Sequence, residues 1–193
     1  TKLKSIARTI KSIQKEELNN TLYTLSTISE NKNINELFYN QDREGLKELL
    51  IPVYKKLNKK YNKFHFHNSN ATSFLRLHKI DKYGDDLSGF RATVVEANKD
   101  KKIIKGLEEG RFGFGFRVVI PISHNGEHVG TVGLGKSFNK EFLKRIEKLY
   151  AGNFYIYKNP EGKIINSSNN NNLLDYIGTP DKYSVRNTTL QKV

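Results

Sequence analysis

Hydrophobic residues recur at spacings of three and four along the first thirty residues, which is the period of one face of an α-helix. The apolar stripe consists of Leu3, Ile6, Ile10 and Ile13 and then, after a one-residue shift, Leu18, Leu22, Leu25 and Ile28. No glycine or proline interrupts it. The pattern predicts one long helix over about residues 1–30. Its narrow stripe would pack on a sheet, on a second copy of the helix, or on both.

Two shorter helices are predicted before the first strands. Residues 34–40 have a weak helical pattern after a polar break. Residues 42–60 have a stronger one, with Asp42 as the expected N-cap. Pro52 lies inside this segment, so we expect the helix to kink or restart there.

Two short segments with alternating apolar and polar residues follow, FHFH at residues 64–67 and FLRLH at residues 74–78. Side chains two residues apart on a strand lie on the same face of a sheet. If the two strands are neighbours, one face carries His65 and His67 from the first strand and Phe74, Arg76 and His78 from the second. Three imidazoles and a guanidinium are an unusual load for a purely structural sheet.

The segment after these strands predicts a helix over residues 87–98 with Asp86 as its N-cap. A short strand is expected to begin at Ile103 and Ile104, and residues 106–110 are expected to form a turn or loop.

Residues 112–122 (FGFGFRVVIPI) have the most regular strand pattern of the chain. Asn125-Gly126 then predicts a hairpin turn, and residues 127–135 the return strand. One face of this hairpin is rich in glycine and carries Gly113, Gly115, Arg117 and Val119 from the first strand and Thr131, Gly133 and Gly135 from the second. Glycines in strands indicate either the close approach of a ligand or backbone, or a twist or bulge in the sheet. The sequence leaves both explanations open.

The last third of the chain predicts an amphipathic helix over residues 138–150 and a hairpin whose strands are residues 154–157 and 163–166. A polar loop follows, and few apolar residues come after it. We interpret residues 153–193 as the start of a second sheet module that is not completed in this chain.

The composition adds a strong positive charge, because 33 Lys and Arg residues oppose 20 Asp and Glu residues, for a formal net charge of +13. Such a charge favours nucleic acid, an anionic membrane surface or acidic ligands as partners. The chain has no cysteine, which excludes thiol catalysis, thiolate metal sites and disulfides. It has no methionine, not even at its start, so we expect a processed chain or an excised fragment. No segment approaches the roughly 18 consecutive apolar residues of a membrane helix.

Two segments resemble a known family: SFLRLHKIDKYGDDLSGFRATVVEAN and GRFGFGFRVVIPISHNGEHVGTVGLG. They are similar to the extracytoplasmic double-Cache sensor regions, of the third double-Cache group, in methyl-accepting chemotaxis receptors and sensor histidine kinases. The resemblance covers about residues 40–137. It implies an α+β fold in which a long N-terminal helix packs on a PAS-like antiparallel sheet, the Cache module, followed by the start of a second, smaller module.

The family organisation implies three regions in this chain. Residues 1–40 would be an N-terminal signalling helix and its connection. Residues 41–137 would be the membrane-distal Cache ligand-binding module, and residues 138–193 a linking helix and a partial membrane-proximal module. A complete double-Cache region has a second sheet of several strands, and this chain departs from that pattern because it supplies only the opening of the second sheet.

The resemblance also implies a function. The parent protein would be a membrane-anchored signal transducer, and this region would be its periplasmic or extracellular ligand-binding domain and not an enzyme. A small molecule would bind the distal module and bias a two-state element. The long N-terminal helix offers a surface for a homodimer.

Arg76 is the first candidate for ligand contact, because its rigid fork of donors suits a carboxylate. An ion pair with Asp85 or Asp86 is the structural alternative. Arg117 is a second candidate clamp, and its alternative is a surface arginine. Asp85 would accept a hydrogen bond from a ligand amine or cap the following helix.

The full set of candidate ligand-binding residues is Arg76, His78, His65, His67, Phe74, Asp85, Gly113, Gly115, Arg117 and Gly133. The basic and imidazole lining favours a small carboxylate, or an amino-acid-like zwitterion held between Arg76 and Asp85. The histidines could also hold zinc, but no cysteine is available and the spacing places no carboxylate beside them. We therefore expect polar lining of a pocket, with no metal and no cofactor.

Nucleic-acid binding and catalysis are the two alternatives to a sensory function. Residues 112–116 are similar to an aromatic strand of RNA-binding domains, and a net charge of +13 suits nucleic acid. Against this, bulky residues fill one face of the strand completely, as in a buried core, and the long first helix has no role. An enzyme is disfavoured because the chain has no nucleophile elbow, phosphate-binding loop or zinc-protease spacing. We therefore expect neither nucleic-acid binding nor catalysis.

Overall fold

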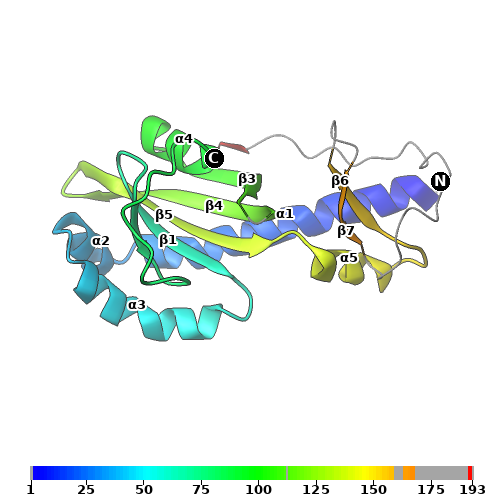
Figure 1. Cartoon of the computed structure of the whole chain (residues 1–193), viewed down its shortest axis with the longest axis horizontal. Helices are drawn as coiled ribbons and strands as arrows, with labels where there is room; N and C mark the ends of the chain where they lie inside the picture. The colour runs from blue at the N-terminus through cyan, green and yellow to red at the C-terminus, as the bar shows by residue number, and fades with distance from the viewer. Residues whose placement is uncertain (1, 112, 159–162, 168–190, 193) are drawn as a thin grey trace. The chain divides into compact units, whose positions relative to one another are not determined.

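The computed structural model describes residues 2–111, 113–158, 163–167 and 191–192 of the 193-residue chain (Figure 1). The chain divides into two compact units. The larger comprises residues 17–137 and 189–193, and the smaller comprises residues 1–16 and 138–188.

The larger unit is built on one antiparallel sheet with the strand order β2-β1-β5-β4-β3-β8. Its strands are β1 (Lys63–Asn68), β2 (Ser73–Arg76), β3 (Ile104–Gly110), β4 (Gly113–His124), β5 (Glu127–Ser137) and β8 (Gln191–Lys192). The hairpin predicted at Asn125-Gly126 joins β4 to β5, and both turn residues have positive φ angles of 50° and 82°. The predicted α+β class is therefore confirmed.

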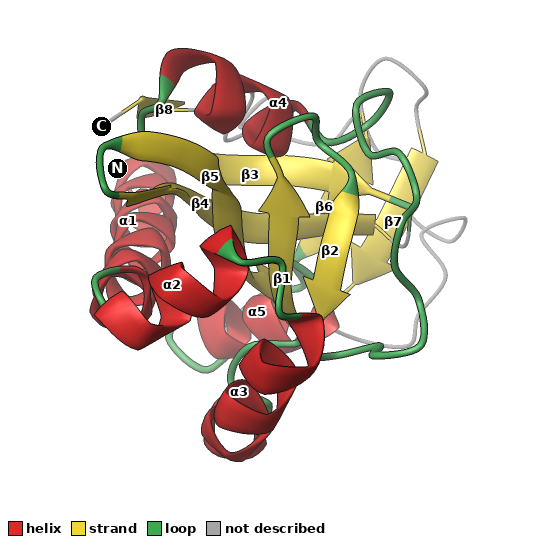
Figure 2. Cartoon of the chain, turned by 90° about the vertical axis from the view of Figure 1, so that its left-hand side faces the viewer, coloured by secondary structure: helices red, strands yellow, loops and turns green. Residues whose placement is uncertain are grey.

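Three helices contribute to the cover of one face of this sheet: α1 (Lys2–Ser29), by its second half, α2 (Lys32–Tyr39) and α3 (Arg43–Leu57) (Figures 1 and 2). Asn31 caps α2 and Asp42 caps α3 through side-chain oxygens. The core between these helices and the sheet consists of Leu25, Ile28, Ile34, Phe38, Leu46, Leu50, Tyr61, Phe64, Phe66, Phe74, Leu75, Leu77, Val118, Ile120, Ile122, Val132 and Leu134. Pro52 does not restart α3, which is continuous from Arg43 to Leu57.

The second half of α1 packs directly on the sheet, as the apolar stripe predicted. Leu25 and Ile28 belong to the core, and buried Glu17 forms an ion pair of 3.0 Å with Lys136 of β5. Among the described residues, no helix has both the length and the hydropathy needed to cross a membrane.

Helix α4 (Ala92–Asp100) lies on the opposite face of the sheet and forms a smaller apolar cluster there (Figures 1 and 2). The cluster contains Ala71, Val94, Ala97, Ile104 and Val119.

The predicted start of this helix, at residue 87 after an Asp86 cap, is wrong. Backbone bonds from Gly84 to Ser73 (2.7 Å) and from Leu87 to Ala71 (3.0 Å) hold residues 84–87 along the edge of β2. The chain is therefore not free to form a helix there, and the Asp86 side chain instead accepts a bond from the Ser88 amide (2.8 Å).

Residues 106–110 are not the predicted turn but the greater part of β3. They pair in register with β4 as far as Gly110 and Gly113. Pairing with a long neighbouring strand supplies the hydrogen bonds that overcome the weak strand propensity of glycine.

The smaller unit contains α5 (Lys140–Glu147) and the hairpin of β6 (Tyr155–Lys158) and β7 (Lys163–Ser167). Asn139 caps α5, and Phe142, Leu143 and Ile146 form its buried side. The hydroxyls of Thr9 and Tyr150, 2.6 Å apart, connect the first half of α1 to this unit. The predicted turn at residues 159–162 and most of the segment after residue 167 lie outside the described residues.

Candidate functional site

The face of the sheet opposite the three-helix core carries most of the side chains predicted to bind a ligand. His65 of β1 lies opposite Arg76 of β2 on one side and opposite Gly133 of β5 on the other. Arg117 of β4 lies opposite Gly135 of β5. The predicted pairing of the two short alternating segments, with imidazoles and a guanidinium on one face, is confirmed.

The alternation predicted for the second of these segments is wrong at Phe74. The pairing of β1 with β2 shifts by one residue after Phe66, so that Ser73 lies opposite His67. Phe74 is the extra residue, and its ring centroid lies 5.0 Å from that of Phe38 in the three-helix core. A single extra residue in an edge strand moves the side chains beyond it to the other face.

The three histidines of this face lie close together. The ring centroids of His65 and His67 are 4.1 Å apart, and those of His65 and His78 are 6.1 Å apart. His65 Nε2 is 2.7 Å from the Ser73 hydroxyl, and His67 Nδ1 is 3.0 Å from the Thr131 hydroxyl. The hydroxyls therefore orient the rings, while His67 Nε2, which is buried, has no hydrogen-bond partner.

These imidazoles are neutral near pH 7. Burial lowers the pKa of His65 and of His67 well below the ordinary value, and the surrounding cations lower both pKa values further. Burial, with Lys63 nearby, lowers the pKa of His78 to about 4. Within the described part of the chain, no three His, Asp or Glu side chains are arranged to hold a metal ion.

We expect this histidine cluster to make the larger unit sensitive to acid. The pKa of each histidine is lower in the folded state, so between about pH 6.5 and pH 4 the unfolded chain binds protons that the folded unit does not. Stability should fall by about 1.4 kcal/mol per pH unit for each such histidine. Urea unfolding between pH 7.5 and 4.5 measures this slope, and His67→Gln should make it shallower. An unchanged unfolding free energy down to pH 5 would contradict the prediction.

Arg76 forms an ion pair with Asp85, which is the structural alternative that the sequence left open. Its Nη1 and Nη2 bind the two carboxylate oxygens of Asp85 at 2.6 and 2.8 Å, and Nη1 also donates to the Lys82 carbonyl at 2.7 Å. The Arg76 guanidinium holds the pKa of Asp85 below its ordinary value. The pair thus anchors the loop that follows β2, and Asp85 does not cap a helix.

Arg117 is not the surface arginine that the sequence left as its alternative. The residue is only 6 % exposed, and its Nε and Nη1 have no hydrogen-bond partner. It makes no ion pair within the described part of the chain. Burial, with a contribution from Arg91, lowers the pKa of Arg117 to about 10, and the Glu108 carboxylate opposes this shift, so the guanidinium is still charged at neutral pH.

The glycines of this face make room for the side chains of Arg117 and His67. A Cβ on Gly115 would lie 2.9 Å from the Arg117 Cζ, and one on Gly135 would overlap the Arg117 Nη1. A Cβ on Gly133 would lie 3.1 Å from the His67 Cε1. The sequence left open the close approach of a ligand or backbone, or a twist or bulge of the sheet, and the structure instead places protein side chains against these glycines.

Gly113 does not belong to this group. It lies exposed at the first position of β4 with a φ of 103°, in the left-handed region that favours glycine. No atom lies within 4 Å of the position its Cβ would take, so its role is conformational.

The sequence-based analysis missed Glu108 and its partners. The Glu108 carboxylate accepts bonds from the Thr93 amide (2.8 Å) and hydroxyl (2.9 Å), and it pairs with Arg91 Nε at 2.8 Å. The Glu108 carboxylate of β3 therefore accepts the hydrogen bonds of the amide and hydroxyl at the start of α4. The alternation of Ile104, Gly106 and Glu108 was a usable signal, but it was hidden by the expectation of a turn at these residues.

Positive charge exceeds negative charge among the side chains identified on this face. The cations are Lys63, Arg76, Arg91 and Arg117, and the carboxylates are Asp85 and Glu108. Burial and then Arg117, Arg91 and Arg76 lower the pKa of Lys63, which shows that these cations lie within electrostatic range of one another. Both carboxylates already form an ion pair with another arginine. Neither of them forms an ion pair with Arg117.

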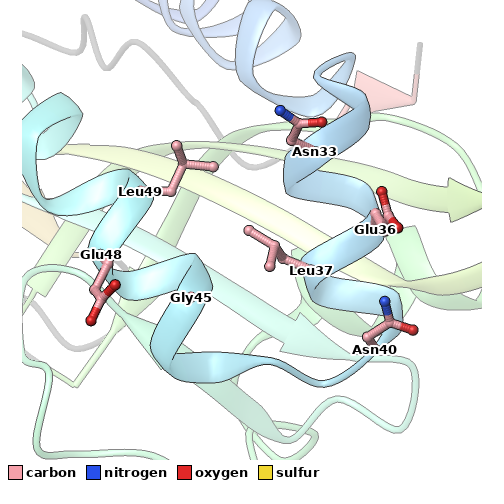
Figure 3. A pocket seen from close by; sticks show the side chains of 7 residues that line it. All are labelled: Asn33, Glu36, Leu37, Asn40, Gly45, Glu48 and Leu49. Carbon is pink, nitrogen blue, oxygen red and sulfur yellow. The ribbon is translucent and has the colours of Figure 1, made fainter.

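A separate hollow of about 490 Å³ lies between α2 and α3, on the helical side of the sheet (Figure 3). It is lined by Asn33, Glu36, Leu37, Asn40, Gly45, Glu48 and Leu49. None of the predicted site residues lines it.

The family that matches residues 2–177 is described as "Double sensory domain of two-component sensor kinase". The chain belongs to this family. Membership in the double sensory domain family confirms the double-Cache resemblance drawn from the two segments. It also confirms that this region is a sensory domain and not a catalytic one.

Two solved structures with TM-scores above 0.5 share the fold of this double sensory domain. The sensor domain of the Vibrio cholerae histidine kinase DctB matches with a TM-score of 0.56 and 8 % identity, over 88 % of this chain and 69 % of that one. The periplasmic domain of Vibrio cholerae LuxQ matches with a TM-score of 0.51 and 13 % identity, over 95 % and 82 %. A ligand-binding domain of the Campylobacter jejuni chemoreceptor Tlp3, in complex with 4-methylisoleucine, has a TM-score of 0.45 and 16 % identity, over 86 % and 72 %. No curated protein matches the chain.

The nucleic-acid alternative is not favoured for this double sensory domain. Phe116, one of the aromatic residues on which it depended, is buried in the sheet. Base stacking needs aromatic rings exposed on the surface of the strand.

Proposed function

We propose that this double sensory domain is the periplasmic or extracellular ligand-binding region of a membrane-anchored histidine kinase or chemotaxis receptor. Its ligand is a small anionic or zwitterionic molecule, such as a carboxylate or an amino-acid-like compound. Residues 41–137 are the membrane-distal ligand-binding module, and residues 138–193 begin the membrane-proximal one. Family membership supports the sensory role, and the buried cation of β4 supports the charge of the ligand.

The observation that carries the proposal is the buried guanidinium of Arg117, whose Nε and Nη1 have no hydrogen-bond partner among the described residues. A buried charge without a partner costs several kcal/mol, so proteins keep such a group where something else compensates for it. A small anion on this face would accept from Nε and Nη1 at once, as the planar fork of arginine favours. The neutral imidazoles beside it would act as uncharged donors and would not repel one another.

The candidate residues divide into two groups in this proposal. Arg117, His67, His65 and His78 line the ligand site, and Gly115 and Gly133 make room for the side chains of Arg117 and His67. Arg76 and Asp85 bind each other and hold the loop that follows β2 in place. Phe74 and Gly113 are left out, because the first packs in the three-helix core and the second is exposed.

A route for the signal follows from β5. Gly135 lies beside Arg117. The next residue, Lys136, donates from Nζ to both carboxylate oxygens of the buried Glu17 of α1, each at 3.0 Å. A displacement of β5 on ligand binding would therefore reach the helix that leads out of the larger unit. A homodimer through α1 remains a prediction, and Tyr23, 69 % exposed on α1, is available for it.

A thermal-shift screen of the purified chain tests this function. The panel contains small carboxylates, amino acids, amines and a short oligonucleotide. A ligand that binds only the folded state should stabilise it by about 2.7 kcal/mol at 100 times its Kd. We expect stabilisation by carboxylates or amino acids. Stabilisation by the oligonucleotide alone, fading steeply with salt, would contradict the proposal.

A further inference from the structure

The unpaired nitrogens of the ligand site belong to two side chains that lie over the same strand. Arg117 Nη1 lies over Gly135, and the His67 ring lies against Gly133. These glycines are two residues apart on one face of β5, a separation of roughly 7 Å. Arg117 Nε and Nη1 and His67 Nε2 are buried, and all three lack a partner. The two side chains thus flank one short stretch of β5 with buried nitrogens that have no partner, and those of Arg117 are donors.

The carboxylates near this stretch are already occupied. Glu108 Oε1 accepts from the Thr93 amide and hydroxyl, and Oε2 accepts from that hydroxyl at 3.0 Å and pairs with Arg91 at 2.8 Å. Asp85 uses one oxygen for each nitrogen of the Arg76 fork. A carboxylate has about four acceptor positions, and the Thr93 amide, the Thr93 hydroxyl and the Arg91 guanidinium take up at most three of those of Glu108.

An ammonium group would also meet repulsion on this face. Arg91, Arg76 and Lys63 all lie within electrostatic range of Arg117 or the histidines. Like charges at short range in a poorly hydrated site are disfavoured far more strongly than in water. An anion placed there would gain from each of these cations.

We propose that the ligand of this site is an anion without an ammonium group, and that Arg117 and His67 are the residues that determine this specificity. Arg117 donates from Nε and Nη1, and His67 donates from Nε2 in the tautomer whose Nδ1 accepts from the Thr131 hydroxyl. This inference rests on the proposed function, because it assigns the ligand class of the same site. Amino acids are discriminated against because, among the described residues of this face, both identified carboxylates already bind arginines and the cations would repel an ammonium group.

The test is calorimetric titration of the purified chain with two matched pairs that differ only by an amine, propionate with alanine and succinate with aspartate. The member without the amine should bind at least tenfold more tightly in a pair that binds. Equal or tighter binding of alanine or aspartate would overturn the inference and leave the proposed function standing. No saturable binding by any of the four compounds would overturn both.

Three variants locate the binding on the chain. Arg117→Met should abolish binding, and Gly135→Ala, which displaces the guanidinium without removing it, should weaken it at least tenfold. The matched control is Arg8→Met, an exposed arginine of α1 in the smaller unit, which should bind as the unmodified chain does. Unchanged affinity in both Arg117→Met and Gly135→Ala would overturn the assignment.

Discussion

Replacing Arg117 with methionine should stabilise the unliganded protein while removing its response to anions. Methionine fills much of the space of the arginine stem without placing a charge in the sheet. Replacing buried charges by apolar residues of similar volume is often neutral or stabilising by about 1–4 kcal/mol. Here we expect the upper part of that range, since two buried N–H groups of Arg117 have no partner. Urea unfolding at pH 7.5 without added anions measures the change.

Arg8→Met is the matched control for this experiment, because it removes the same charge from an exposed position. Its unfolding free energy should stay within about 0.5 kcal/mol of the unmodified chain. Destabilisation by Arg117→Met would mean that the guanidinium is needed for folding and would remove the main support for a ligand site there. A gain in stability together with loss of ligand response would instead identify Arg117 as a residue kept for function at the expense of stability.

Replacing Arg76 with alanine should have the opposite effect and destabilise the larger unit. The change leaves Asp85 unpaired, removes the bond to the Lys82 carbonyl and creates a cavity beside His65. Breaking a buried pair costs about 3–5 kcal/mol, and because the Asp85 side chain is 26 % exposed we expect about 2–4 kcal/mol. Urea unfolding of the variant measures this loss.

A double-mutant cycle with Asp85→Ala separates the ion pair from the cavity. The double variant should cost less than the sum of the single variants, because each single change already breaks the same interaction. Lys79→Ala, an exposed neighbour on the same loop, is the control and should be nearly neutral. If Arg76→Ala lost anion binding at unchanged stability, Arg76 would contact the ligand, as the sequence first indicated, and would not serve as a loop anchor.

Arg76 and Arg117 show how much of the site could be predicted from the sequence. Alternation along the strands placed His65, His67 and Arg76 on one face, and the glycines marked a place of close approach. Which arginine has a partner could not be read from the pattern. That depends on Asp85 returning to the edge of β2 and on Glu108 being taken by Arg91 and Thr93.

The errors in the fold have one common cause. The shift at Phe74, the late start of α4 and the extension of β3 through residues 106–110 all depend on backbone pairing with segments elsewhere in the chain. Local propensity cannot detect such pairing. An edge strand can accept an extra residue, and a strand rich in glycine can be held by a long neighbour.

The sequence by itself determined the long first helix, the two short paired strands, the glycine-bearing hairpin and the double-Cache family. The helix, the strands and the hairpin follow from hydrophobic periodicity and local turn chemistry, which each segment carries alone, whereas the family was indicated by the resemblance of two segments. Only the tertiary structure decided that Arg76 is paired and Arg117 is not. Ion pairing and burial cannot be predicted from one segment alone. They depend on which charges the folded chain brings together and on how much water it excludes from them.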